Sequence, residues 1–308
     1  MSSLTMRFDD VYQEFLSEED YDKTVDLYTE ATRLHAQIIA ASSVGTEGFK
    51  QLVLKLVNSL VGLFGKIYVK LKTISRTFSS LKITEWDEYK AKNIVLVNNN
   101  NTRNYSKLVN LSMPYPRGMK TTYFNALSKI VVCLDVFDMR NRSQSFLDIC
   151  TDIQKNATKG VISTDTPILQ SQLTEVNSIV DLFNAYDKLF DPKMRTGEKR
   201  FGDLFTNQNE FKQVGALLSQ NSKHLYQVQT VFKNVEAANK QLKGTLDAIG
   251  KMPDGALTKE QLMSLSNACM FFAKTTDMYG ITIQDYHRVE HNYVEVHKSM
   301  VKQKVSEL

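Results

Sequence analysis

The most distinctive stretch of the sequence is residues 47–82, which read EGFKQLVLKLVNSLVGLFGKIYVKLKTISRTFSSLK. Thr46 can cap a helix at this point, and no proline or cluster of turn residues interrupts the stretch before Lys82. A helix of this length extends about 54 Å, at 1.5 Å per residue. We therefore predict one long, unbroken helix over 47–82.

This predicted helix is apolar along one side and basic around it. Apolar residues recur every three or four positions from Phe49 to Leu81, and seven lysine or arginine residues flank or oppose them. Such a helix suits a membrane surface, because its apolar side enters the acyl layer while its cations meet anionic headgroups. It equally suits the centre of a helical bundle, where neighbours cover the apolar side and lysines extend to solvent. The candidate interaction residues are Lys50, Lys55, Leu60, Phe64, Lys66, Lys70, Lys72 and Arg76.

Charge changes sign along the N-terminal part of the chain. Residues 1–45 carry nine acidic and three basic residues, whereas residues 46–84 carry seven basic residues and one acid. This contrast favours contact between the two segments, or between the second segment and an anionic surface. The net charge of the whole chain is only +4, so nucleic acid is not expected as a specific partner.

The composition is that of a folded, helical protein. Among 308 residues there are only 13 glycines and 5 prolines, which favours long uninterrupted elements. The three cysteines have no paired spacing, so we expect reduced, buried thiols. The N-terminus lacks the pattern of a signal peptide, and no run of about 18 uninterrupted apolar residues occurs. We expect an intracellular protein without a constitutive transmembrane helix.

Residues 93–120 are the exception to the helical pattern. The run Ile94–Val97 and the mixed run Tyr105–Ser112 flank four consecutive asparagines, and the turn residues Met113–Gly118 follow. We predict a small β-hairpin that projects from the helical body.

The remaining chain divides into helical segments. Helices are predicted at about 121–139, 143–156 and 167–183, and a basic loop at 193–200 separates two halves. In the second half, one helix starts after Thr258 with Gly280 as its C-terminal cap, and the last begins near Ile283. The expected organisation is 1–92 N-terminal helices, 93–120 hairpin, 121–191 central helices and 201–308 C-terminal helical hairpins.

The strictest periodicity spans residues 211–249, where seam residues alternate steps of three and four without exception. This is the heptad pattern of a coiled coil, and its two asparagines would fix register or partner number. The seam fits a long helix of an intramolecular bundle or an intermolecular coiled coil. Its principal residues are Phe211, Leu218, Asn221, Leu225, Phe232, Asn239 and Leu246. The expected fold is therefore mainly α, an elongated bundle with long coiled-coil-like helices and a small β-hairpin.

One string of residues could carry enzymatic chemistry. His287 and His291 lie one helical turn apart with Glu290 between them, an H-x-x-E-H string that can ligate zinc. Only 17 residues follow His291, too few for the distant third ligand that such sites need, and a polar helix face explains the string equally well. Phosphate-binding loops, nucleophile elbows and C-x-x-C pairs are missing from the sequence. We expect no cofactor and no enzyme.

The lysine-rich stretch 49–81 and the coiled segment FKQVGALLSQNSKHLYQVQTVFKNVEAANKQLKG (211–244) together resemble internal virion or head proteins of large tailed bacteriophages. The resemblance lies in the general character of these two segments and in their order along the chain, and no diagnostic motif is shared. It implies a non-enzymatic structural protein in the virion or in the host cytoplasm, with other virion proteins or copies of itself as partners. The alternative is a membrane-active protein, such as a pore-former, an effector or an ejected protein, that uses the helix at 47–82.

Overall fold

The computed structural model describes residues 18–41, 46–79, 85–94, 108–113, 123–157, 195–200, 204–205, 207–221, 223–253 and 256–305. Most of these residues are helical, so the protein is mainly α, as predicted. The elements are α2 (Glu18–Ala40), α3 (Thr46–Ser79), α4 (Glu85–Lys92), β1 (Leu108–Met113), α6 (Tyr123–Phe137), α7 (Met139–Ala157), β2 (Arg195–Arg200), α10 (Gln208–Asn221), α11 (Lys223–Lys251) and α12 (Lys259–Val305).

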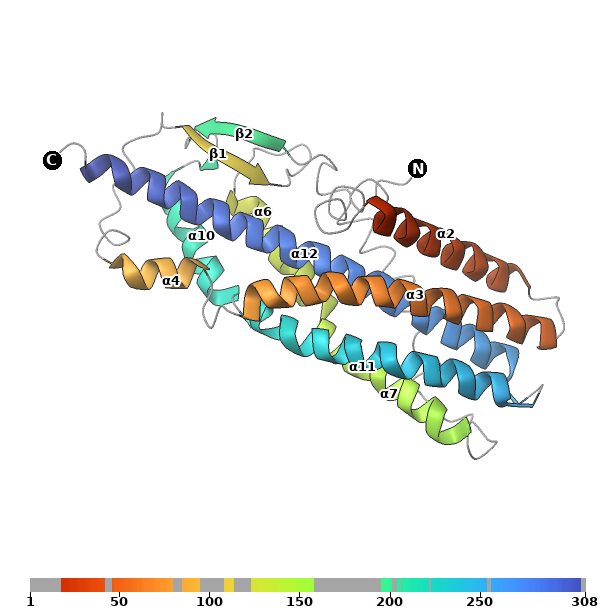
Figure 1. The fold of residues 1–308 in the computed structure, drawn as a ribbon. Helices are drawn as coiled ribbons and strands as arrows, with labels where there is room; N and C mark the ends of the chain where they lie inside the picture. Colours follow the sequence, from red (N-terminus) through yellow and green to blue (C-terminus); the bar gives the residue numbers. More distant parts are fainter. Residues whose placement is uncertain are drawn as a thin grey trace.

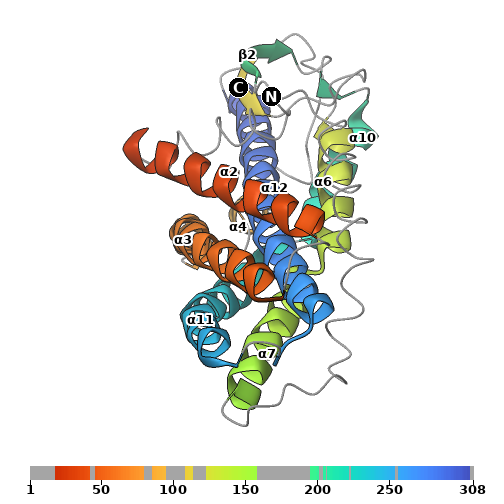
Figure 2. The ribbon, with the colours of Figure 1, turned by 90° about the vertical axis from the view of Figure 1, so that its right-hand side faces the viewer.

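Helix α12 is the axis of the fold (Figure 1). It is 47 residues long, which corresponds to about 70 Å. Helices α2, α3, α4, α6 and α7 and strand β1 all pack against it. Helix α11 lies beside α3 and α7, and α2 lies across α3 and α12 when the bundle is viewed along its length (Figure 2). Five of the described helices, from both the N-terminal and the central parts of the chain, therefore pack on one helix.

The core is built where α3, α7 and α12 meet. The rings of Phe146 and Phe272 stack with their centroids 4.2 Å apart, and Phe64 lies 5.4 Å from Phe272. All three side chains are buried. The buried apolar residues of α3 recur mostly every three or four positions, with two adjacent pairs that widen the stripe, as expected of a helix with one broad buried side. They are Phe49, Val53, Leu56, Val57, Leu60, Leu63, Phe64, Ile67, Leu71 and Ile74.

Several predicted boundaries agree with the structure. Helix α3 covers the predicted stretch up to Ser79, and residues 80–82 lie outside the described residues. Helices α6 and α7 match the first two predicted central helices and are separated by Asp138, whose φ of 41° is left-handed. Aspartate tolerates this conformation better than most residues. The predicted helix at 167–183 lies outside the described residues.

Two predicted boundaries are wrong. Gly280 does not end a helix, because α12 continues through it to Val305. A Cβ atom at this glycine would lie 3.5 Å from Lys70 Cε and 3.6 Å from Leu71 Cδ2, so Gly280 marks the crossing of α12 with α3. The seam at 211–249 is also divided between two helices, α10 and α11, and does not form a single one.

The only sheet in the described part of the chain has two strands. Strand β1 pairs antiparallel with β2, and Leu108 stands opposite Arg200. β1 lies inside the predicted hairpin, but its partner is the stretch that we predicted as a basic loop. Arg195–Arg200 reads RTGEKR and contains no apolar residue, so strand periodicity is missing and the pairing comes from tertiary context. The predicted first strand falls mostly on residues 95–97, outside the described residues.

The three cysteines agree with the prediction. Cys133, Cys150 and Cys269 are buried, and no disulfide joins them. Burial raises the pKa of the Cys150 thiol to about 12 and also raises the pKa of the Cys269 thiol. Both thiols are therefore protonated and unreactive at neutral pH.

Candidate functional site

Two lysines of α3 lie inside the bundle rather than on its surface. The side chain of Lys70 is 2% exposed, and its Nζ lies 3.0 Å from Oδ1 of Asp277 on α12, whose side chain is 3% exposed. Lys50 is also buried, and its Nζ donates to the backbone carbonyl of Met252 at 2.7 Å. Neither lysine can reach a membrane or a partner while α3 stays in this position.

Helix α2 contributes a polar group, the Tyr28 hydroxyl, near the Lys70–Asp277 pair. The buried hydroxyl of Tyr28 lies near Asp277, and burial, followed by the charge of Asp277, raises the pKa of Tyr28. Thr24, one turn earlier in α2, is also buried. Residues of three helices therefore surround this ion pair, and their packing keeps water away from it.

The outward side of α3 carries less charge than the sequence suggested. Lys55 is exposed, while Lys66 and Lys72 are partly exposed, and Nζ of Lys72 lies 5.7 Å from the centroid of the Tyr68 ring. Val69 is 47% exposed. The side chain of Arg76 lies outside the described residues. Leu60 and Phe64, which we predicted as interaction residues, belong to the core.

Helix α2 packs on α3, as the opposite charges of the two segments predicted. Gly62 permits the close approach, since a Cβ atom there would lie 3.1 Å from Cδ2 of Leu27. Glu30 of α2 has a lowered pKa, mainly because Arg33 donates hydrogen bonds to it and, to a smaller extent, because Arg33 and Lys55 attract its charge. An apolar side chain, Leu27, thus lies in the contact between α2 and α3, and Glu30 and Lys55 attract each other across the two helices.

Within the described residues, one helix is long and apolar enough to cross a bilayer. This stretch is Gly48–Ile74 of α3. The test considers length and composition only, and the core helix of a soluble protein has the same properties.

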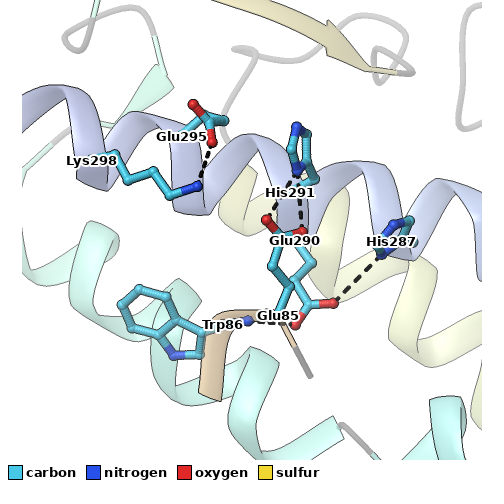
Figure 3. Close-up of polar contacts among 7 residues, drawn as sticks. All are labelled: Glu85, Trp86, His287, Glu290, His291, Glu295 and Lys298. Carbon is cyan, nitrogen blue, oxygen red and sulfur yellow. Dashed lines mark hydrogen bonds and ion pairs between the residues drawn. The ribbon is translucent and has the colours of Figure 1, made fainter. Parts of the chain in front are cut away.

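The His-x-x-Glu-His string does not form a common centre (Figure 3). Glu290 accepts a hydrogen bond from the backbone N–H of Trp86 at 3.0 Å, while Nδ1 of His291 lies 3.1 Å from the carboxylate of Glu85. Nδ1 of His287 lies 3.9 Å from Oε2 of Glu290. Within the described part of the chain, no three His, Cys, Asp or Glu side chains are grouped so that they could hold a metal ion.

The buried carboxylate of Glu290 instead fixes the start of α4. The first N–H groups of a helix have no partner in their own helix and carry partial positive charge. An acidic side chain from α12 satisfies one of them here and attaches α4 to the axis of the fold.

The predicted seam packs within the chain. Phe211 of α10 lies 4.8 Å from Tyr293 of α12, and Phe232 of α11 stacks on Tyr68 of α3 at 5.1 Å between centroids. Leu218 is buried, and its carbonyl accepts a hydrogen bond from Tyr286. The other seam residues are Asn239 and Leu246, which are half-buried, Leu225, whose side chain lies outside the described residues, and Asn221, which bonds its own helix.

Asn221 is hydrogen-bonded within its own helix. Its Nδ2 donates to the carbonyl of Leu217, four residues earlier, at the end of α10. The asparagine therefore satisfies a carbonyl near the C-terminus of its own helix.

A cavity of about 540 Å³ lies between α4, α10 and α12. Its lining includes four aromatic side chains and two lysines: Trp86, Phe211, Tyr293, His297, Lys90 and Lys212. Nδ1 of His297 lies 3.0 Å from the hydroxyl of Tyr89. Burial lowers the pKa of His297 to about 4, so the ring is neutral at neutral pH.

Two nitrogen atoms in this lining are unsatisfied. Nε1 of Trp86 and Nε2 of His297 are buried and have no hydrogen-bond partner among the described residues. Their side chains are 4% and 1% exposed. No local motif in the sequence predicts this group, and its only signals there are the single tryptophan of the chain and a histidine among apolar residues near the end of the chain.

Comparisons of the chain with protein-family models, with curated proteins and with solved structures gave no match.

Proposed function

We propose that the chain is a non-enzymatic structural or interaction protein of a phage particle. The observation that carries the proposal is the position of α3, the segment on which the sequence analysis centred. Its apolar side and two of its lysines are occupied by contacts with α2, α11 and α12. A helix whose apolar side is covered in this way stabilises the bundle and is not free to bind a membrane.

The phage setting rests on the sequence resemblance of residues 49–81 and 211–244 alone. The proposal includes an elongated bundle with coiled-coil-like helices, partners among other virion proteins or copies of the chain, and a location in the virion or the host cytoplasm. The residues from Asn98 to Arg103, expected from the sequence as a hairpin tip, are proposed as a peripheral contact for such a partner.

Particle composition tests this proposal. Particles purified on a density gradient should contain the chain, as measured by quantitative mass spectrometry, and cross-linking should join it to another particle protein or to a second copy. A chain that is missing from purified particles and strictly monomeric at high concentration in sedimentation velocity would overturn the proposal.

The second candidate is a membrane-active protein, favoured by the length and apolar character of Gly48–Ile74. To reach a bilayer, α3 would have to leave the bundle and separate Lys70 from Asp277. The two candidates therefore differ in what happens when that pair is broken.

Liposome flotation separates the two candidates. We compare the wild-type protein, Asp277→Leu and the double variant Lys70→Met with Asp277→Leu, each with neutral and with anionic vesicles. The structural proposal expects all three proteins to stay in solution. Flotation of the wild-type protein with anionic vesicles, increased in Asp277→Leu and reversed in the double variant, would support the membrane-active candidate instead.

A further inference from the structure

We propose that the bundle bends at a hinge in α12 around Gly280. This inference concerns a conformational device and does not depend on the function proposed above. Two helical interruptions, one between α6 and α7 and one between α10 and α11, lie at the level of this glycine. The elements on either side of this level are packed separately, so the two sides can change their angle.

The described elements form two packed groups along α12 (Figure 1). Helices α2, α3, α7 and α11 pack on the N-terminal part of α12 or on one another, and we call this group the first half. Helices α4, α6 and α10 and strand β1 pack on the C-terminal part of α12 or on one another, and we call this group the second half.

Each half has its own aromatic contacts with α12. In the first half, the ring of Phe146 stacks on that of Phe272 at 4.2 Å. In the second half, the rings of Phe211 and Trp86 lie 4.8 Å and 4.7 Å from that of Tyr293. A bend of α12 between Phe272 and Tyr293 therefore leaves both sets of contacts in place.

The two helical interruptions lie side by side. Asp138 separates α6 from α7, and α10 ends at Asn221 before α11 begins at Lys223. Oδ1 of Asp135, in the last turn of α6, lies 3.1 Å from Nε2 of His224 and 3.5 Å from Nζ of Lys223. The end of α6 therefore contacts the start of α11, where neither pair of helices is continuous.

The contact that joins the two interruptions is exposed to solvent. The side chains of Asp135 and Lys223 are 53% and 59% exposed. Exposed ion pairs contribute little to stability. This contact therefore holds the halves together without locking their angle.

Helix α12 is continuous at this level but is weakened there. The hydroxyl of Tyr279 donates to the carbonyl of His224 at 3.4 Å, which places Tyr279 beside the start of α11. Gly280 follows directly and is the only glycine of α12. Glycine in the interior of a helix makes the helix less stable, because it has more conformational freedom than other residues.

Threonines on either side of Gly280 weaken the same stretch of α12. The hydroxyls of Thr275, Thr276 and Thr282 each donate to the backbone carbonyl four residues earlier, at 2.6–2.8 Å. Such bonds compete with the backbone hydrogen bonds of a helix and often bend it. The residues that favour bending are thus located at the level where the other helices are interrupted.

The expected displacement is large enough to measure. Helix α4 contacts α12 near His297, where the Tyr89 hydroxyl lies 3.0 Å from Nδ1 of the histidine. A bend of about 20° at Gly280 moves this level, about 25 Å further along α12, by about 9 Å. Distances between the halves should vary by this amount, while distances within each half stay fixed.

Double electron–electron resonance between pairs of spin labels measures these distances. The labels are attached through Ala36→Cys and Lys243→Cys in the first half, and through Ala91→Cys and Val132→Cys in the second. All four positions are exposed, and the three native cysteines are buried and should not react with the label. We expect distance distributions about 5–10 Å broader for pairs across the halves than for pairs within one half.

Two glycine variants locate the bend. Gly280→Ala should reduce the bent fraction about fivefold, because alanine favours the helix, and should narrow the distributions across the halves. Gly65→Ala is the matched control, since Gly65 lies inside α3 and a Cβ atom there has nothing within 4 Å. It should leave every distribution as in the wild type. Circular dichroism of each labelled protein checks that the fold is kept.

Two results would overturn the proposal. Distributions across the halves that are as narrow as those within each half would show that the bundle is rigid at this level. Broad distributions that Gly280→Ala narrows no more than Gly65→Ala does would place the motion outside α12. Both variants add a single methyl group at a position with space for it, so the test does not depend on a disruptive substitution.

Discussion

Two regions of α12, one around Asp277 and one around His297, differ in how their buried polar groups are paired. In the N-terminal half, Asp277 is paired with Lys70 and Asn267 is hydrogen-bonded to His35 at 2.7 Å, so these polar groups are matched inside the bundle. In the C-terminal half, His297 lies beside Trp86, and each ring has a nitrogen without a partner at a cavity. Unpaired buried polar atoms cost stability, so we expect the surroundings of His297 to contribute less to stability than the matched pairs around Asp277.

The space around two glycines, Gly280 and Gly215, also differs between the two regions. A Cβ atom at Gly280, in the crossing with α3, would meet its neighbours at ordinary contact distances of 3.5 Å or more. A Cβ atom at Gly215, in the cavity wall, would lie 2.8 Å from the Trp86 ring and 2.9 Å from the Tyr293 hydroxyl. Around the cavity, two buried nitrogen atoms therefore lack hydrogen-bond partners, and the packing leaves no room for a side chain at position 215.

The largest expected effect comes from breaking the buried ion pair. Asp277→Leu leaves the Lys70 charge buried without its partner and should lower the free energy of unfolding by about 3–5 kcal/mol. The double variant Lys70→Met with Asp277→Leu should be within about 1 kcal/mol of the wild type or more stable. Urea unfolding measures both variants. A single variant as stable as the wild type would show that the pair is not buried in solution.

The next effect concerns the cavity wall. Gly215→Ala forces its new methyl group against the Trp86 ring and should lower the free energy of unfolding by about 1–3 kcal/mol. The emission of Trp86, the only tryptophan, should shift as its ring is displaced. An unchanged spectrum together with unchanged stability would mean that α4 and α10 do not approach each other at this point.

A comparable effect should appear on acidification. Burial lowers the pKa of His297 from 6.5 to about 4. As the pH falls below about 6.5, the unfolded chain binds a proton that the folded chain does not, so stability is lost between about pH 6.5 and about pH 4. Between about pH 7 and about pH 4.5, the wild type should lose about 2 kcal/mol more than His297→Gln.

The comparison with His297→Gln isolates this histidine. The pKa values of His35 and His224 are also lowered by burial, but both residues are present in the two proteins, so their contributions cancel. Equal losses in the two proteins, measured by urea unfolding at both pH values, would show that His297 is solvated.

The smallest effect has the opposite sign. Gly280→Ala introduces a better helix former where its methyl group fits, and should raise the free energy of unfolding by up to about 1 kcal/mol. A clear loss of stability in thermal unfolding would indicate a closer crossing of α3 and α12 than the structure shows.

The sequence predicted the parts of the fold that depend on local periodicity. Helix α3 and its buried stripe, and the pair α6 and α7, follow from apolar residues at helical spacing. The division between α10 and α11 could not be predicted in this way, because the three-and-four spacing continues unchanged across it. Gly280 was misplaced for a related reason, since the preference of glycine for helix ends was overridden by packing against α3.

The candidate site could not be predicted from the sequence, because it depends on contacts between residues that are far apart along the chain. Lys70 and Asp277 are separated by 207 positions, and nothing local distinguishes Lys70 from the exposed Lys55. The cavity likewise combines side chains of α4, α10 and α12, so the proximity of Trp86 and His297 depends on how the helices pack and cannot be predicted from the local sequence. The H-x-x-E-H string illustrates the converse, because its local pattern suggested a metal site while Glu290 was engaged by α4.

The central claim is that α3 is a core helix of an intramolecular bundle. Hydrogen exchange followed by mass spectrometry tests it most directly, with peptides covering residues 48–74 of α3 and 262–281 of α12, in buffer and with anionic vesicles. We predict that the two segments exchange equally slowly and that vesicles change neither. Rapid exchange in 48–74 while 262–281 stays protected, or protection of 48–74 only when vesicles are added, would contradict the account.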